Sequence, residues 1–150
     1  MPQVQDVAEY ILKLHGPMTA MKLQKLCYYA QAWSLVWDDR PLFEERLEAW
    51  ANGPVSPVLY SMHLGEFNVT TVGGDASVIT DPASIETLNV VIEHYGKMTA
   101  AQLSELTHAE QPWKGARKGF PEGVRSSNVI EPAAMVEYYG GLTMDNSEVV

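Results

Sequence analysis

Hydrophobic residues between Met18 and Trp37 recur at helical spacing, and this segment contains no glycine or proline. Its apolar residues form two faces, one made of Leu23, Leu26, Cys27, Ala30, Trp33 and Trp37, the other of Tyr28, Tyr29, Ala32, Leu35 and Val36. A helix that is apolar on two faces belongs inside a domain, with other elements packed around it. Thr19 is placed to cap it, because its side chain can accept a hydrogen bond from an N–H of the first turn. The pattern predicts a buried central helix from Ala20 to about Trp37.

The same pattern returns 80 residues later. The stretch from His15 to Trp33 aligns without a gap to the stretch from Tyr95 to Trp113, and 8 of the 19 positions are identical. Each copy has a helix, a glycine, a capping threonine and a second helix, which predicts two related helix–turn–helix hairpins. Thr99 and Gln102 form a capping box in the second copy. Two explanations stay open: a true duplication, or one good turn-and-cap sequence used twice.

Other stretches of the chain predict shorter helices. Ser56-Pro57 and Asp81-Pro82 each combine a capping residue with a proline suited to the first helical turn. Pro112 disfavours helical geometry at Gln111, so the preceding helix ends there and a short helix begins. The further helices predicted run from Gln3 to Leu14, from Pro57 to Leu64, from Pro82 with an apolar stripe at Ile85, Leu88, Ile92 and Tyr95, and from Pro132 to a stop at Gly140-Gly141.

Two regions predict β structure. Leu42-Phe43 and the segment from Leu47 to Trp50 are interpreted as two short strands separated by charged residues. The segments from Val69 to Val72 and from Ser77 to Thr80 flank a glycine-rich turn. They allow two interpretations, a hairpin or a mobile loop.

Length and composition limit the architecture. A chain of 150 residues with 46% hydrophobic content is long enough for one well-formed domain. We therefore predict a mainly α, compact single domain over residues 1–140, with six or seven helices, a small β element near residues 42–50 and the two related hairpins. Residues 143–150 show no hydrophobic period, so residues 141–150 are predicted to form a disordered C-terminal tail.

Charge and cysteine content narrow the functional classes. The chain has 19 acidic and 10 basic residues and a net charge of −9. Nucleic-acid-binding domains usually carry a basic footprint, so the charge argues against a nucleic-acid partner. A single cysteine excludes an internal disulfide and fits a reducing compartment. The N-terminal residues lack the pattern of a signal peptide, and the apolar runs are too short to span a membrane. The sequence predicts a cytoplasmic protein without a membrane segment.

The sequence lacks the common catalytic motifs. Cys27 is a candidate nucleophile with His63 or His108 as its base, but a cysteine on an apolar helix face is usually a buried small hydrophobe. The spacing from His108 to Glu110 does not match zinc ligands on a helix, so His108 is interpreted as a structural hydrogen-bonding residue. We predict a protein that is not an enzyme and that holds no metal or cofactor.

Five motifs, separated along the chain, together match the pattern of one protein family. They are Lys22-Leu23-Gln24-Lys25-Leu26-Cys27-Tyr28-Tyr29-Ala30-Gln31-Ala32-Trp33, Arg40-Pro41-Leu42-Phe43, Glu48-Ala49-Trp50-Ala51-Asn52-Gly53-Pro54-Val55, Leu59-Tyr60, and Leu106-Thr107-His108-Ala109-Glu110-Gln111-Pro112-Trp113. Together they resemble the Panacea domain, a family also described as phage-associated GepA-like or SocA-like antitoxins, from about Val7 to Tyr139. The resemblance implies an antitoxin that neutralises a cognate toxin, encoded by an adjacent gene, through direct protein contact. In some relatives it implies delivery of the toxin to a protease.

Positions that carry the motifs are interpreted as structural. They are Thr19, Leu23, Leu26, Trp33, Gly53, Thr99, His108, Pro112 and Trp113. Trp33 and Trp113 occupy equivalent places in the two hairpins and are expected to be buried. Trp50, beside the Asn-Gly-Pro sequence, is expected to be more exposed.

Toxins countered by this family often act on RNA or nucleotides, so the resemblance implies a basic surface on the partner. Carboxylates can steer such a surface and a tryptophan can anchor it. The candidate contact residues are Asp38, Asp39, Glu44, Glu45, Glu48, Trp50, Pro54 and Val55. Two alternatives stay open. Either these acids are merely solvated while Trp50 packs under the strands, or the interface lies on the face of Lys114, Arg117 and Lys118.

A second function is also open. The repeated hairpin and the basic cluster of Lys114, Arg117, Lys118 and Arg125 are compatible with a helix–turn–helix transcriptional regulator. The net charge of −9 counts against that function.

Overall fold

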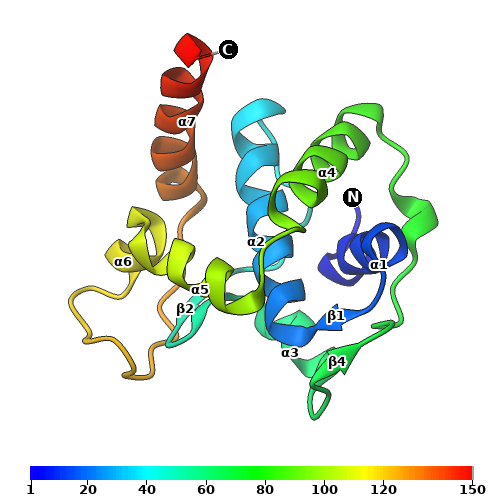
Figure 1. Ribbon diagram of the computed structural model, residues 1–150, viewed down its shortest axis with the longest axis horizontal. Helices are drawn as coiled ribbons and strands as arrows, with labels where there is room; N and C mark the ends of the chain where they lie inside the picture. The colour runs from blue at the N-terminus through cyan, green and yellow to red at the C-terminus, as the bar shows by residue number, and fades with distance from the viewer. Residues whose placement is uncertain (150) are drawn as a thin grey trace.

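A computed structural model describes the backbone of residues 1–149 and the side chains of residues 1–142 (Figure 1). This part of the chain forms seven α-helices: α1 (Val4–His15), α2 (Ala20–Trp37), α3 (Pro57–His63), α4 (Pro82–Tyr95), α5 (Ala100–Ala109), α6 (Gln111–Ala116) and α7 (Pro132–Val149). Four short strands and one 3-10 turn complete it: β1 (Met18–Thr19), β2 (Glu48–Trp50), β3 (Gly53–Val55), β4 (Asn68–Val69) and η1 (Ala76–Val78). The predicted mainly α architecture is confirmed.

Helix α2 lies at the centre of the fold, with α4 and α1 on one side and α7 on the other (Figure 1). Its predicted cap is confirmed, because Thr19 Oγ1 accepts a hydrogen bond from the Lys22 N–H at 3.2 Å. Thirteen of its 18 residues are buried, and the four consecutive residues from Leu26 to Tyr29 have no exposed surface. Since its neighbours bury most of α2, this helix forms the core of the domain and lacks the long exposed face of a DNA-recognition helix.

The repeated sequence forms two helix pairs, α1–α2 and α4–α5, whose turns contact each other. The predicted capping box is present: the Gln102 N–H donates to Thr99 Oγ1 at 3.1 Å, and the Thr99 N–H donates to Gln102 Oε1 at 2.9 Å. Lys22 Nζ, from the first pair, donates to the carbonyl oxygen of Gly96 in the second at 2.6 Å. The turns are not identical, because Gly16 has a φ of +97° whereas Gly96 is in the right-handed helical region.

The predicted β element near residues 42–50 is present, but one of its strands was placed wrongly. β2 pairs with β3 in an antiparallel hairpin, with Trp50 opposite Gly53. Leu42-Phe43, predicted as a strand, is a buried segment bound by an α2 side chain. The Leu42 N–H donates to Gln31 Oε1 at 2.8 Å, and Gln31 Nε2 donates to the Phe43 carbonyl oxygen at 2.8 Å. The buried glutamine satisfies backbone groups that a neighbouring strand would otherwise bind.

The hairpin interpretation of residues 69–80 is wrong. Val69 instead pairs with Met18, which joins β4 to β1. Residues 76–78 form η1, where Asp75 Oδ1 accepts a hydrogen bond from the Ser77 N–H at 3.0 Å. Glu9 of α1 accepts a hydrogen bond from the Val72 N–H at 2.9 Å. Distant partners therefore determine this segment, and local turn residues do not reveal them.

Both core tryptophans are buried as predicted. Trp33 is 6% and Trp113 is 3% exposed. The indole N–H of Trp33 donates to the Tyr95 hydroxyl at 2.9 Å, which ties α2 to α4. The indole N–H of Trp113 donates to the carbonyl oxygen of Trp50 at 2.8 Å, which ties α6 to β2.

A buried cluster around Glu110 holds α7 against α2. Tyr29 and Tyr139 each donate a hydroxyl hydrogen bond to Glu110 Oε1 at 2.7 Å. The Tyr28 hydroxyl lies 3.0 Å from the Tyr139 hydroxyl. Tyr28 is the donor of this hydrogen bond, because the Tyr139 O–H already donates to Glu110. Burial is the main cause that raises the pKa of the Glu110 carboxyl. The cluster connects α2, the junction between α5 and α6, and α7.

Helix α7 differs from the prediction at its end. It continues through Gly140 and Gly141, where the sequence predicted a stop, and reaches Val149. The side chains of residues 143–150 and the backbone of Val150 lie outside the described part, so the disorder of residues 141–150 stays a prediction. Over the residues that the structure describes, no helix is both long and apolar enough to cross a bilayer.

Candidate functional site

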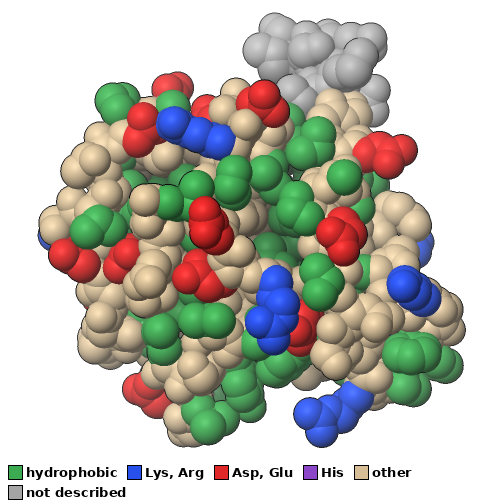
Figure 2. Space-filling view, turned by 180° about the vertical axis from the view of Figure 1, so that it is seen from behind, with side chains coloured by type: hydrophobic (Ala, Val, Ile, Leu, Met, Phe, Trp, Pro, Cys, Tyr) green, Lys and Arg blue, Asp and Glu red, His purple; other side chains and the backbone are tan. Residues whose placement is uncertain are grey.

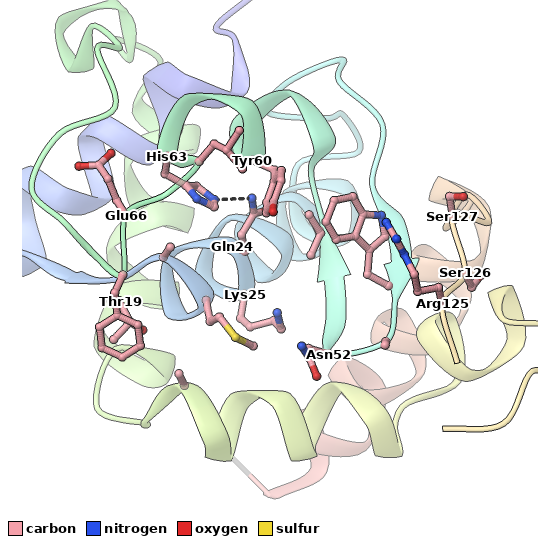
Figure 3. Close-up of a pocket in the computed structure, with 18 of the residues that line it drawn as sticks. Thr19, Gln24, Lys25, Asn52, Tyr60, His63, Glu66, Arg125, Ser126 and Ser127 are labelled. Atoms are coloured by element: carbon pink, nitrogen blue, oxygen red, sulfur yellow. Dashed lines mark hydrogen bonds between the residues drawn. The ribbon is translucent and has the colours of Figure 1, made fainter. Parts of the chain in front are cut away.

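A groove with a volume of about 1020 Å³ crosses the described domain beside the N-terminal half of α2 (Figure 3). Helix α3 lies along one side of it and α5 along the other, and the β2–β3 hairpin stands toward one end. We name it the Lys25 groove after the lysine near its centre. Its lining residues are Thr19, Ala20, Met21, Gln24, Lys25, Trp50, Ala51, Asn52, Val55, Tyr60, His63, Leu64, Gly65, Glu66, Phe67, Ala100, Phe120, Arg125, Ser126, Ser127 and Asn128.

Lys25 projects from α2 into the groove toward Asn52 (Figure 3). The residue is only 1% exposed, and its ammonium makes no hydrogen bond and no ion pair with any residue that the structure describes. Burial lowers the pKa of Lys25 to about 8. Lysine is almost never fully buried unless it is paired, so this unpaired ammonium is an unusual feature that requires an explanation.

Gln24, the neighbouring polar residue of α2, is fully bonded inside the protein. Its Oε1 accepts a hydrogen bond from the Ser56 N–H at 2.8 Å, and its Nε2 donates to the Ser56 carbonyl oxygen at 3.2 Å. The same Nε2 lies 3.0 Å from His63 Nε2, which is therefore the acceptor. Burial lowers the pKa of His63, in agreement with a neutral ring. These bonds fix α3 against α2 and leave Lys25 as the unpaired polar group of α2 in the groove.

Large apolar side chains line the groove and remain exposed. Phe67 is 75% and Leu64 is 65% exposed, and Phe120 and Tyr60 are 47% and 39% exposed. The half-buried Trp50 ring packs edge-on against Tyr60 at a centroid distance of 5.0 Å. Exposed apolar surface that is concentrated in a concave site commonly marks a binding site.

The structure brings together only part of the predicted contact region. Trp50, Pro54 and Val55 all lie in the β2–β3 hairpin, and Trp50 and Val55 line the Lys25 groove. Pro54 is buried in β3. Asp38 and Asp39 follow the far end of α2, and the 18 residues of that helix span about 27 Å.

Three of the five predicted acidic contacts are engaged within the fold. Asp38 accepts a hydrogen bond from the Thr87 hydroxyl at 2.8 Å, and Glu45 accepts one from the Val4 N–H at 3.0 Å. Glu48 is buried and accepts from Arg46 and from the indole N–H of Trp50. Asp39 and Glu44 are exposed. Figure 2 shows acidic side chains scattered over one face among basic ones, rather than gathered in a single patch.

Sequence reasoning missed Lys25, Tyr60, Phe67 and Phe120 as groove residues. Lys25 carried one signal: it is a charged residue inside a helix whose neighbours are apolar in nearly every direction. Tyr60 belonged to the Leu59-Tyr60 motif, which did not indicate a groove, and Phe67 and Phe120 carried no signal, because these segments are distant in sequence and meet only in the folded protein.

The candidate catalytic residues have structural surroundings. Cys27 has no exposed surface, and burial raises the pKa of its thiol. The His108 ring stacks on Trp113 at a centroid distance of 4.0 Å, and its Nδ1 lies 3.3 Å from Glu122 Oε1. The described residues contain no group of three or more His, Cys, Asp or Glu side chains arranged to hold a metal ion.

The basic cluster does not form one surface. Arg117 is 2% exposed and donates hydrogen bonds to the carbonyl oxygens of Ala49, Pro121 and Val124. It therefore anchors the loop after α6, whereas Lys114 and Lys118 are exposed and Arg125 lines the groove.

Comparison with known proteins places these features in a family. Residues 23–114 match the family described as "Antitoxin SocA-like, Panacea domain". The chain is 32% identical over 110 residues to the protein named antitoxin SocA of Caulobacter vibrioides (strain NA1000 / CB15N). That match covers 65% of this chain and 58% of the relative, so the chain spans less than two thirds of the relative's length. No solved structure matches. The chain belongs to the family of SocA-like antitoxins with a Panacea domain.

Proposed function

We propose that this protein is an antitoxin that neutralises a cognate toxin by binding it directly, and that the Lys25 groove is part of the contact surface. Membership of the SocA-like antitoxin family is the observation that carries the proposal. The matched segment, residues 23–114, includes Lys25, Trp50, Val55, Tyr60 and Phe67. The groove therefore belongs largely to the part of the chain that defines the family.

The character of the groove supports a binding module rather than an enzyme. Its lining combines exposed aromatic and aliphatic side chains with polar and charged residues, as in protein-binding surfaces. Cys27 lies in the core and His108 stacks on Trp113, so neither is placed to attack a substrate.

Two observations count against the transcriptional regulator. The second helix of the first hairpin, α2, is buried along most of its length. The exposed start of α5, in the second hairpin, carries Gln102 and Glu105 rather than lysine or arginine. A recognition helix needs an exposed face that can approach phosphates and base edges.

Growth rescue tests the proposal. The protein encoded by the adjacent gene is expressed from an inducible promoter, with and without this antitoxin, and colony counts are compared. We expect rescue by the wild-type protein, and co-elution of the two purified proteins in size-exclusion chromatography. Toxicity that persists despite equal expression, with no co-elution, would contradict the proposal.

The half-life of the toxin then separates two modes of neutralisation. If the antitoxin acts by blocking, the toxin accumulates in the complex. If it presents the toxin to a protease, the toxin is degraded faster when the antitoxin is present. Pulse-chase measurement in a protease-deficient strain and its parent distinguishes the two outcomes.

A further inference from the structure

The Lys25 ammonium lacks a counter-ion inside the described protein. A buried charge costs free energy unless an opposite charge or hydrogen-bond acceptors compensate for it. Gln24 is bonded to Ser56 and His63, and no hydrogen bond joins its side chain to the lysine. In Figure 3 the Lys25 side chain points toward Asn52, whose side chain is a neutral amide. A ligand that brings a carboxylate into the groove would supply the missing partner.

The position of Lys25 indicates what kind of carboxylate this is. Lys25 lies near the middle of the groove, with Glu66 toward one end and Arg125 toward the other (Figure 3). A terminal carboxylate at Lys25 would end the bound chain halfway and leave the rest of the groove empty. A side-chain carboxylate lets the chain continue in both directions.

The walls beside Lys25 indicate the neighbours of that carboxylate. Apolar and aromatic side chains of Met21, Val55, Tyr60, Phe67 and Phe120 line the same groove. Apolar side chains on a bound segment would bury this surface and exclude water from the ion pair, which strengthens the pair.

We propose that the Lys25 groove binds an internal segment of the partner toxin in which an aspartate or glutamate lies between large apolar residues and pairs with Lys25. The proposal rests on the proposed function and specifies the chemistry of its contact. It also assigns a role to a lysine that the fold does not pair.

A peptide selection tests the chemistry independently of the toxin. Random peptides that are tethered at both ends and displayed on phage are selected on the full-length protein. We expect the enriched sequences to contain one aspartate or glutamate flanked by large apolar residues. Enrichment of sequences without a carboxylate would overturn the proposal. Tight binding of inorganic phosphate, with no peptide enriched, would assign the groove to a small anion instead.

Calorimetric titration of one selected peptide locates the carboxylate. Replacing its acidic residue by the matching amide should weaken binding to the wild-type protein by about tenfold or more. The Lys25→Met protein should bind the acidic peptide more weakly than the wild type by the same factor. It should also bind the acidic and the amide peptide with equal affinity, which shows that the two groups are directly coupled. Lys13→Met removes an exposed lysine of α1 outside the groove and should bind as the wild type does. Retained discrimination in Lys25→Met would overturn the proposal.

A second measurement needs no variant. In protein labelled with ¹³C-lysine, the Lys25 side-chain resonance is titrated with and without the peptide. The paired carboxylate should raise the pKa of Lys25, and an unchanged pKa in the saturated complex would contradict the pairing.

Finally, the peptide should compete with the toxin for the antitoxin. Peptide binding without any toxin binding would refute the proposed function while the chemistry of the groove stands, and toxin binding unaffected by Lys25→Met would refute the inference alone.

Discussion

The side chain of Lys25 crosses directly over Gly53. A β-carbon at residue 53 would lie 2.4 Å from Cε of Lys25, and Gly53 has a φ of +123°, which L side chains rarely adopt. The turn into β3 therefore requires the glycine of the Asn-Gly-Pro sequence, and a side chain at this position would also displace the end of Lys25. The path of the lysine into the groove depends on the absence of a side chain there.

Gly53→Ala should therefore destabilise the protein by more than backbone strain alone. An unfavourable φ costs about 1–3 kcal/mol, and displacing Lys25 adds to that cost. Gly73→Ala is the matched control, because Gly73 has a φ of +77° with no atom within 4 Å of the added β-carbon. Urea denaturation of both variants measures the difference. Equal losses would show that Lys25 moves aside at no cost.

Lys25→Met should stabilise the isolated protein while it weakens partner binding. Burial lowers the pKa of Lys25 from 10.5 to about 8, and each unit corresponds to about 1.4 kcal/mol, so the variant should gain about 3 kcal/mol at neutral pH. A methionine of similar length fills the same space without a charge. Chemical denaturation at pH 7 provides the measurement.

The pH dependence of that gain gives a check on its cause. Below pH 8 the lysine is charged in both the folded and the unfolded state, so the wild-type protein carries the whole burial cost. Between pH 8 and 10.5 the folded state loses the proton first, and wild-type stability rises relative to the variant. The stability difference should vanish above pH 10.5, and a constant difference would exclude lysine burial as the cause.

The stability of the Glu110→Gln variant should increase relative to that of the wild-type protein as pH rises. The glutamine keeps an oxygen acceptor for Tyr29 and Tyr139 and removes the buried charge. Because burial raises the pKa of Glu110, the folded state holds this proton more tightly, and wild-type stability falls as pH rises from 4.5 through the raised value. Unfolding free energies measured from about pH 4 to about pH 8 test this trend. The exposed Glu137→Gln serves as the control and should show no such trend.

Trp33→Ala should cost about 3–5 kcal/mol, the range for loss of a large aromatic side chain from a core. The residue is 6% exposed and binds Tyr95 through its indole N–H. Trp37 stacks on Trp33 but is 42% exposed, so Trp37→Ala should cost clearly less. Denaturant midpoints of the two variants provide the comparison, and similar midpoints would contradict the burial argument.

Charge reversal at Asp39 and Glu44 tests the acidic stretch as an alternative contact. These two acids are exposed, whereas Asp38 and Glu45 hold hydrogen bonds that the fold needs. If the Lys25 groove is the contact, the association rate with the toxin should change little at low salt. A large fall in that rate, together with a weaker salt dependence, would show that the interface includes the acidic residues between Asp38 and Glu48.

Local chemistry made part of the fold predictable. Thr19, and Thr99 with Gln102, satisfy N–H groups within one helical turn, so their caps can be read from neighbouring residues. The partner of β4 could not be read in this way, because Val69 pairs with Met18, a residue distant in the sequence. Likewise, Gln31 binds Leu42-Phe43 from another element and replaces the expected strand.

The groove could not be predicted from the sequence either, because it is formed by residues that are distant along the chain. Its wall combines α2, the β2–β3 hairpin, α3 and the loop before Asn128. Lys25 is buried because Gly53 lets the two elements approach closely, a relationship between residues that no helical period contains. The motif around Trp50 did indicate one side of the groove, since Trp50 and Val55 line it.

The segment that defines the family is shorter than the unit that folds, as the burial of Tyr139 in α7 shows. Residues 23–114 define the family match, yet Val7 and Ile11 of α1 and Tyr139 of α7 have no exposed surface and pack into the same core. A fragment cut to the matched residues would open two apolar faces of α2 to water and would be prone to aggregate. Fusing this domain to another protein, or trimming it for binding studies, therefore requires both flanking helices.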